Sequence, residues 1–265
     1  IETVVLGLLT GYVAVFIMMA FLIVKYLGIG IGKWSNLKEQ LAFALPTIPS
    51  NVSSWVVDSS DKYVIGILIG SVAVGCSSPG YALGSILLMF LSPFAVLLPA
   101  VLPEHYEKGN MSEVDKYLSY SMKYYLLLTI PAAVGMSVLS KPLLYIITTP
   151  EIALGGYMVT PFVCLGAIFM GMYGITNNIL ILEKNTMILG KLWIVVAISN
   201  IVLNLLLVPY LNILGAAIAT LICYILAFAV TAIASKKTMR LPFNIKELLK
   251  IVTAASIMGI AVYIM

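Results

Sequence analysis

Long apolar runs and short polar connections alternate along the whole chain. A membrane-spanning helix needs about 20 consecutive apolar residues, and most of the runs reach that length. Two runs are too long for one helix, and we expect breaks at the turn-rich residues 75–80 and 209–212. The pattern predicts eight spanning helices, over residues 3–24, 43–70, 79–102, 119–139, 156–182, 187–208, 212–234 and 249–265.

Composition supports a membrane protein and excludes several other classes. Hydrophobic residues make up 62% of the 265 positions and charged residues 10%, whereas soluble domains are about a quarter charged. The mean hydropathy is +1.08. A soluble enzyme, a nucleic-acid-binding module and a disordered chain are therefore excluded, and three cysteines make no disulfide framework. We predict an all-α integral membrane protein, a polytopic bundle of about eight transmembrane helices.

The basic residues predict how the bundle is oriented. Thirteen of the fifteen Lys and Arg residues fall in alternate connections, and the opposite connections hold only Lys141. Basic residues are retained in cytoplasmic loops, so we expect a multi-pass protein of the cytoplasmic membrane with charged loops inside and the first residue outside. The net charge of +4 is then a topology signal and does not indicate a nucleic-acid partner.

The two ends suggest a piece of a longer protein. The chain starts Ile1-Glu2 without an initiator Met and enters a span almost at once. The last span offers only about 15 apolar residues, fewer than a crossing needs. We therefore expect a C-terminal fragment of a larger polytopic protein.

Charged side chains interrupt the second predicted span. Asp58, Asp61 and Lys62 share one helix face because they are spaced three and four residues apart, and Trp55 and Asn51 continue that face. At about 1.5 Å per residue the two aspartates lie roughly 20–24 Å along the helix from Leu45. One interpretation is an internal Asp58–Lys62 ion pair that fixes helix packing. The other is a cavity wall that meets a charged substrate or an ion, because membrane-embedded charges need a partner or water.

Other polar residues within the spans leave alternatives open. Asn177 could face a cavity or pack between helices. Asn200 and Asn204, four residues apart, are better explained by hydrogen bonds between helices that stabilise their packing. Lys123 could reach the membrane interface or the interior cavity. His105 is the single histidine and has no neighbouring ligand set, so we expect no metal site.

Several of these segments, taken in order, resemble one superfamily. Residues 45–50 followed by 58–65 resemble the seventh-helix segment of the Wzx-type polysaccharide flippases, which share a superfamily with the MATE exporters and the lipid II flippases. Residues 200–209 and 215–220 look like its helix 11–12 junction. Lys62 stands where the flippases usually have Arg, and an ammonium cannot hold a phosphate in the bidentate manner of a guanidinium.

The resemblance implies a domain organisation. It would make residues 1–36 a preceding transmembrane helix with a cytoplasmic linker. Residues 37–235 would form the second six-helix lobe of a MATE-like transporter, and residues 236–265 a cytoplasmic loop with the start of a further helix. The N-terminal lobe of the same chain would then be missing, and transport would need it because the cavity lies between lobes.

The resemblance also implies a function. The leading hypothesis is a flippase that moves a lipid-linked oligosaccharide, a polyprenyl-phosphate or -pyrophosphate sugar, across the cytoplasmic membrane for cell-surface polysaccharide synthesis. Lys62 and Lys123 would attract the phosphate, Asp58 and Asp61 would set the local potential or bind a coupling cation (Na⁺ or H⁺), and Trp55, Tyr63 and Asn177 would meet sugar rings. The alternative is a MATE-like, ion-coupled exporter of cationic drugs. We expect no enzyme and no cofactor, since no catalytic set or nucleotide loop is present.

Overall fold

A computed structural model describes residues 2–28, 47–236 and 245–264. The chain divides into two compact units, Ile1–Phe43 and Ala44–Met265. In the first unit, α1 (Glu2–Leu27) is one apolar helix, which agrees with the span predicted over residues 3–24. The predicted cytoplasmic linker that follows lies mostly outside the described residues.

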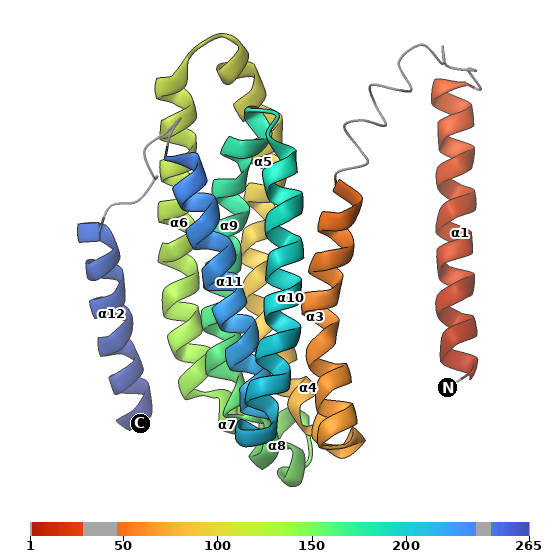
Figure 1. The fold of residues 1–265 in the computed structure, drawn as a ribbon, viewed down its shortest axis with the longest axis vertical. Helices are drawn as coiled ribbons and strands as arrows, with labels where there is room; N and C mark the ends of the chain where they lie inside the picture. Colours follow the sequence, from red (N-terminus) through yellow and green to blue (C-terminus); the bar gives the residue numbers. More distant parts are fainter. Residues whose placement is uncertain (1, 29–46, 237–244, 265) are drawn as a thin grey trace. The chain divides into compact units, whose positions relative to one another are not determined.

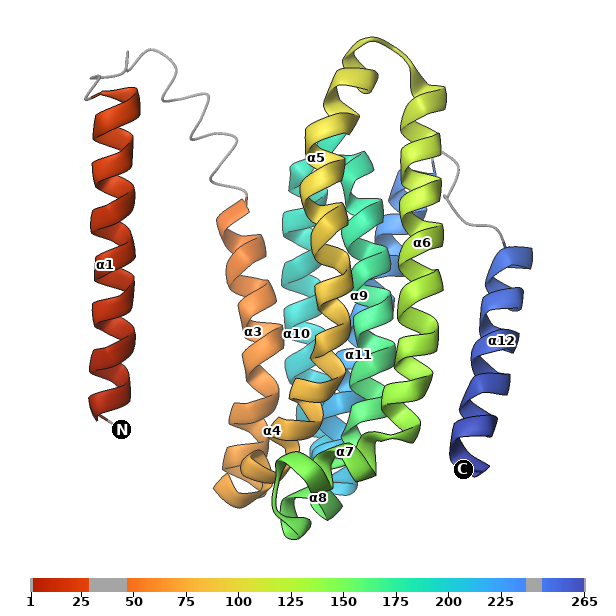
Figure 2. The ribbon, with the colours of Figure 1, turned by 180° about the vertical axis from the view of Figure 1, so that it is seen from behind.

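The second unit is a bundle of long helices, seen from two sides in Figures 1 and 2. Short helices α7 (Ser140–Ile147) and α8 (Pro150–Gly156) cap one end. Its long helices are α3 (Thr47–Leu68), α4 (Ser71–Ser85), α5 (Ser92–Glu107), α6 (Met111–Val138), α9 (Val159–Leu182), α10 (Thr186–Leu211), α11 (Ile213–Ser235) and α12 (Ile245–Ile264).

Two apolar clusters around α9 hold the bundle together. On one side, Tyr125 and Leu118 of α6 and Ile175 of α9 are almost fully buried. On the other side, Val57 of α3 and Trp193 of α10 pack with residues of α9 and α11. Since α9 contributes to both clusters, it is the central helix, and α3 is held through α10 and α11.

The predicted break at residues 75–80 is wrong. These residues lie inside α4, and the chain turns instead at Gly70, whose φ of 119° excludes most other residues. The small residues of the predicted break serve packing, because a Cβ at Gly80 would lie 2.4 Å from the Gly156 carbonyl oxygen of α8. A 3₁₀ segment, Ile86–Leu91, joins α4 to α5 within the same path.

The polar connection predicted between the third and fourth spans is mostly helical. Helix α5 runs to Glu107 and α6 begins at Met111, so only three residues connect them. Charges in these helix ends pair along the helix surface, as in Lys108–Glu104 at 2.6 Å. Ion pairs between residues four positions apart stabilise a helix, so the helix can continue beyond the apolar segment that spans the membrane.

The number of spans agrees with a polytopic membrane protein. Within the described residues, six helices are long and apolar enough to cross a membrane, and α6 with α7, bent by 68°, makes a possible seventh. Helix α3 is not among them, and it carries the three charged residues of the second predicted span. The predicted all-helical, multi-pass fold is therefore confirmed, with six or seven candidate spans among the described residues.

Helix α12 packs along α6 within the second unit. A Cβ added to Gly259 of α12 would lie 2.5 Å from a methyl group of Val134, so the backbone approaches α6 closely. An ion pair of 2.8 Å between Lys123 and Glu247 links the same two helices. The described part of the segment predicted over residues 236–265 is thus docked on the lobe.

Candidate transport site

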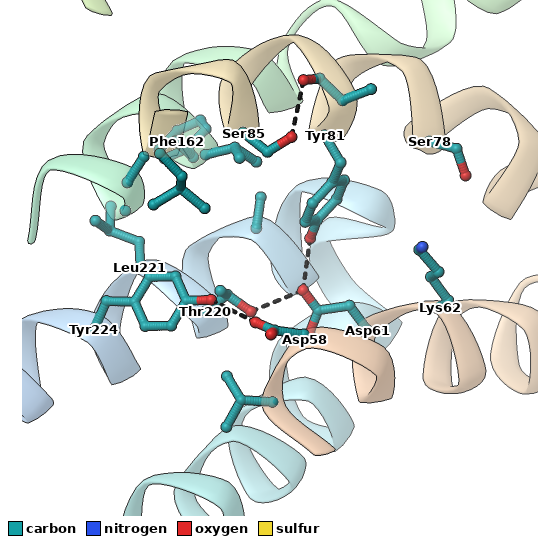
Figure 3. Close-up of a pocket in the computed structure, with 17 residues that line it drawn as sticks. Asp58, Asp61, Lys62, Ser78, Tyr81, Ser85, Phe162, Thr220, Leu221 and Tyr224 are labelled. Carbon is teal, nitrogen blue, oxygen red and sulfur yellow. Dashed lines mark hydrogen bonds between the residues drawn. The ribbon is translucent and has the colours of Figure 1, made fainter. Parts of the chain in front are cut away.

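A polar pocket opens between α3, α4, α9 and α11 (Figure 3). Its volume is about 410 Å³. The side chains that give it polar character are Asp58, Asp61, Lys62, Ser78, Tyr81, Ser85, Thr220 and Tyr224. The remainder of its lining is apolar, from residues such as Leu88, Phe162 and Leu221. A mostly apolar cavity with a few convergent polar groups is the usual form of a small-molecule binding site.

Asp61 is the hub of this pocket. Its side chain is 3% exposed, and its carboxylate accepts three hydrogen bonds. Tyr81 of α4 and Thr220 of α11 donate to Oδ2 at 2.8 and 2.7 Å, and Asn204 of α10 donates to Oδ1 at 2.8 Å. A buried carboxylate is costly without such donors. Asp61 therefore joins four helices, α3, α4, α10 and α11.

The network continues from Asp61 into α10. The Asn200 side chain accepts a hydrogen bond from Ser60 and donates to Thr220 Oγ1 at 3.1 Å. Both asparagines are fully buried. They do bond between helices, as the sequence indicates, but through the network around Asp61. The Oδ1 atom of Asn204 is buried and accepts no hydrogen bond from any described residue, so one buried oxygen beside Asp61 has no partner in the described part of the chain.

Asp58 and Lys62 face the pocket with more freedom. Asp58 accepts one hydrogen bond at Oδ1, from the Tyr224 hydroxyl at 2.8 Å, and its side chain is exposed. Lys62 is exposed as well and projects from α3 toward the space that faces α4 (Figure 3). Both residues are described, and no ion pair joins them. The structure therefore shows no direct Asp58–Lys62 ion pair of the kind that the packing interpretation requires, and both side chains are exposed.

The pocket separates the residues proposed from sequence into two groups. Asp58, Asp61 and Lys62 line it together. Trp55 and Asn51 are exposed on α3 outside its lining. Asn177 of α9 and Lys123 of α6 also lie outside it. Asn177 accepts a hydrogen bond of 3.4 Å from Asn178, and Lys123 pairs with Glu247 on α12.

Three lining residues were not expected from sequence. Tyr81, Thr220 and Tyr224 supply three of the four side-chain donors to the two aspartates, and Asn204 supplies the fourth. Thr220 closes a run of small residues that we assigned to helix packing, and the two tyrosines stand among apolar neighbours. The only feature of the sequence that could have indicated these residues is a side-chain hydroxyl group within an apolar run. Its partner lies on another helix, so spacing along one helix could not reveal the pair.

The polar groups of the pocket are carboxylates, an ammonium and hydroxyl groups. Within the ranges that the structure describes, no group of three or more His, Cys, Asp and Glu side chains gathers around a common point. The pocket instead offers one accessible carboxylate, one accessible ammonium and several hydroxyl groups. This combination suits a hydroxyl-bearing or charged ligand that is bound reversibly.

The fold and the pocket define a helical, multi-pass membrane protein with a polar binding site inside its bundle. A family model described as MatE matches residues 46–206. This match covers more than half of the chain, and the chain belongs to the MatE family.

Two similar proteins extend the comparison. The chain is 22% identical over 201 residues to a protein of Haloferax volcanii described as "Probable low-salt glycan biosynthesis flippase Agl15", which covers 76% of this chain and 41% of that protein. A solved structure described as "Lipid II flippase MurJ, inward closed conformation" has the same fold, with a TM-score of 0.70 and 24% identity over 94% of this chain and 53% of that one. The chain thus spans about half the length of the proteins it matches, and both of these proteins are described as flippases.

Proposed function

We propose that this chain is one lobe of a flippase that moves a lipid-linked oligosaccharide across the cytoplasmic membrane. The observation that carries the proposal is the pocket in which Asp58, Asp61 and Lys62 meet inside an apolar bundle. The flippases to which the chain is similar support the substrate class. A polar head group needs such a site to cross the bilayer, whereas the lipid tail can stay in the hydrocarbon phase.

In this proposal, different pocket residues bind different parts of the head group. Lys62 supplies an exposed ammonium that forms no hydrogen bond or ion pair with the described residues, and this ammonium attracts the phosphate or pyrophosphate. Asp58 has one carboxylate oxygen without a protein donor, which accepts hydrogen bonds from sugar hydroxyl groups. The N-terminal lobe of the same protein would form the opposite wall, and the head group would pass between the two.

Asp61 has a different role in this proposal. Its oxygens already accept hydrogen bonds from three donors on three other helices. A change in the arrangement of those helices would therefore change the hydrogen bonding of Asp61. Carboxylate and amide oxygens are ligands that hard cations prefer, and the Asn204 oxygen without a partner adjoins Asp61. A coupling cation, Na⁺ or H⁺, would compete with the donors at Asp61 and shift the arrangement of α3, α4, α10 and α11.

The experiment uses the full-length protein in liposomes. Leaflet exchange of a labelled polyprenyl-phosphate-linked sugar is followed for the wild type, for Lys62→Ala and for Asp61→Asn. Loss of one lysine at a bound phosphate is expected to lower exchange about tenfold or more, because charge-assisted hydrogen bonds are worth about 1.5–3 kcal/mol. Lys108→Ala is the matched control, since Lys108 pairs with Glu104 at the surface, and it should leave exchange unchanged.

The acidic character of the pocket favours one alternative, a MATE-like exporter of cationic drugs. Two carboxylates face a single ammonium there, and a drug cation would bind at Asp58. Uptake of a cationic dye driven by an ion gradient, in the absence of sugar-lipid exchange, would establish the exporter. In that case Lys62→Ala would preserve or increase transport, the opposite of the flippase prediction.

A further inference from the structure

A second cavity lies on the outer surface of the bundle, between α10 and α11. This lateral groove has a volume of about 280 Å³ and is lined by Ile188, Lys191, Leu192 and Val195 of α10 and by Leu226 and Val230 of α11. It shares no lining residue with the polar pocket. Five of its six side chains are aliphatic, and Lys191 alone brings charge.

Lys191 occupies an unusual place for a charged residue. It lies in the second turn of α10, a helix apolar enough to span a membrane. Its side chain is exposed, and within the described ranges it forms no hydrogen bond or ion pair. A charge at such a position is costly in a bilayer unless an anion or water meets it.

The surrounding helices supply no anion for Lys191. Helices α10 and α11 contain no Asp or Glu. Glu183, which follows α9 at the same end, forms no ion pair, and its Oε1 atom is buried without a hydrogen-bond partner. Lys184 and Lys236, just beyond the ends of α9 and α11, add further positive charge there. Because α10 and α11 are antiparallel and joined at Asn212, both of their charged ends lie at one end of the pair.

We propose that the lateral groove binds an anionic phospholipid of the surrounding membrane. An acyl chain would lie along the aliphatic side chains between α10 and α11, and the headgroup phosphate would meet the Lys191 ammonium. Basic sites between transmembrane helices near a membrane face suit anionic lipid headgroups. The depth of Lys191, close to a helix end rather than at mid-span, matches the level of a phosphate above its acyl chains. This inference does not rest on the proposed transport function.

The test uses full-length protein in nanodiscs of phosphatidylcholine with a small fraction of a photoactivatable lipid. The probe carries its photoreactive group on the acyl chain and has either a phosphatidylglycerol or a phosphatidylcholine headgroup. Crosslinked peptides are mapped by mass spectrometry. We expect phosphatidylglycerol to label peptides containing residues 188–195 or 226–230, and Lys191→Gln to lower that labelling about fivefold, the effect of one lysine near an anionic lipid.

Matched variants separate charge from shape. Lys191→Arg should retain labelling, Leu226→Trp should reduce it by filling the groove, and Lys108→Gln, which removes a surface lysine elsewhere, should have no effect. Gel filtration of each variant checks that the fold is intact, and labelling is compared only among variants that elute as the wild type does. Equal labelling by both headgroups, or labelling that Lys191→Gln leaves unchanged, would overturn the proposal. Displacement of the probe by polyprenyl phosphate but not by excess unlabelled phosphatidylglycerol would overturn it too, since the groove would then hold a substrate lipid.

Discussion

At the scale of single residues, Asp61 shows how one buried charge can organise a membrane protein. Its three donors come from α4, α10 and α11, while Asp58, one turn away, has a single donor and stays exposed. The two carboxylates therefore differ in environment although they stand three positions apart. Asp61 is suited to stabilising and sensing the helix arrangement, and Asp58 to contacting a ligand.

Loss of one donor tests this division at Asp61. Tyr81→Phe removes the hydroxyl that donates to Asp61 Oδ2. We expect the free energy of unfolding to fall by at least about 1 kcal/mol, because a hydrogen bond to a charged group is worth about 1.5–3 kcal/mol. Thermal unfolding of the detergent-solubilised protein measures the change.

Tyr63→Phe is the control for this prediction. Tyr63 is 63% exposed on the same span, and its hydroxyl makes no hydrogen bond with the described residues. Its removal should leave the melting temperature unchanged. Equal shifts for the two variants would show that the Tyr81–Asp61 bond contributes nothing.

At the scale of secondary-structure elements, close backbone contact positions α4. Helix α4 supplies Tyr81 to the site, and Gly80 beside it lies against the Gly156 carbonyl of α8. The short helix α8 thus acts as a support for the wall of the pocket. The packing leaves no room for a side chain at residue 80. The two atoms nearest to a Cβ at this position belong to the backbone of Gly156, and backbone cannot move aside as a flexible side chain could.

A pair of glycine substitutions tests this contact. Gly80→Ala would place a Cβ 2.4 Å from the Gly156 oxygen, whereas Gly75→Ala, one turn earlier on α4, meets nothing within 4 Å. We expect Gly80→Ala to lower the melting temperature clearly. Gly75→Ala should leave it unchanged or raise it, because Ala is favoured over Gly in a helix by up to about 1 kcal/mol. A tolerated alanine at residue 80 would contradict the close packing of α4 and α8.

At the scale of the whole molecule, the bundle separates basic residues by end. Lys108 stands in the α5–α6 connection and Lys184 in the α9–α10 connection, at one end of the bundle, and α7 and α8 cap the other (Figure 2). From the positive-inside rule we expect the first end to face the cytoplasm. The proposed flippase would then load its head group from that end.

Cysteine labelling in cells checks the orientation. In a cysteine-free background, Lys184→Cys should react with a membrane-impermeant maleimide only after the membrane is permeabilised. Glu151→Cys, on α8, should react in intact cells, because it lies at the opposite end. The reverse pattern would invert the topology and the direction of transport that we propose.

The sequence alone was sufficient for the class of protein and for the position of most spans. A helix that crosses the lipid bilayer needs a long run of apolar side chains. Such runs can be recognised directly in the sequence, and the eight predicted runs correspond to helices in the structure. The sequence also drew attention to Asp58, Asp61 and Lys62, because charges within a span are rare and costly, and the structure places these three residues in the lining of one pocket. The helical state of residues 75–80 and the helical ends of α5 and α6 were missed, since local turn residues and charges are compatible with helix when tertiary contacts favour it.

Only the tertiary structure decided which polar groups meet. Tyr81, Asn204 and Thr220 are far from Asp61 in sequence, and they converge because α4, α10 and α11 pack around α3. The same packing pairs Lys123 with Glu247 and places Lys191 on an outer groove, where no described acidic residue forms an ion pair with it. Hydrogen bonds and ion pairs act over a few ångströms in space. Spacing along one helix can therefore show which face a charge occupies but not which helix supplies its partner.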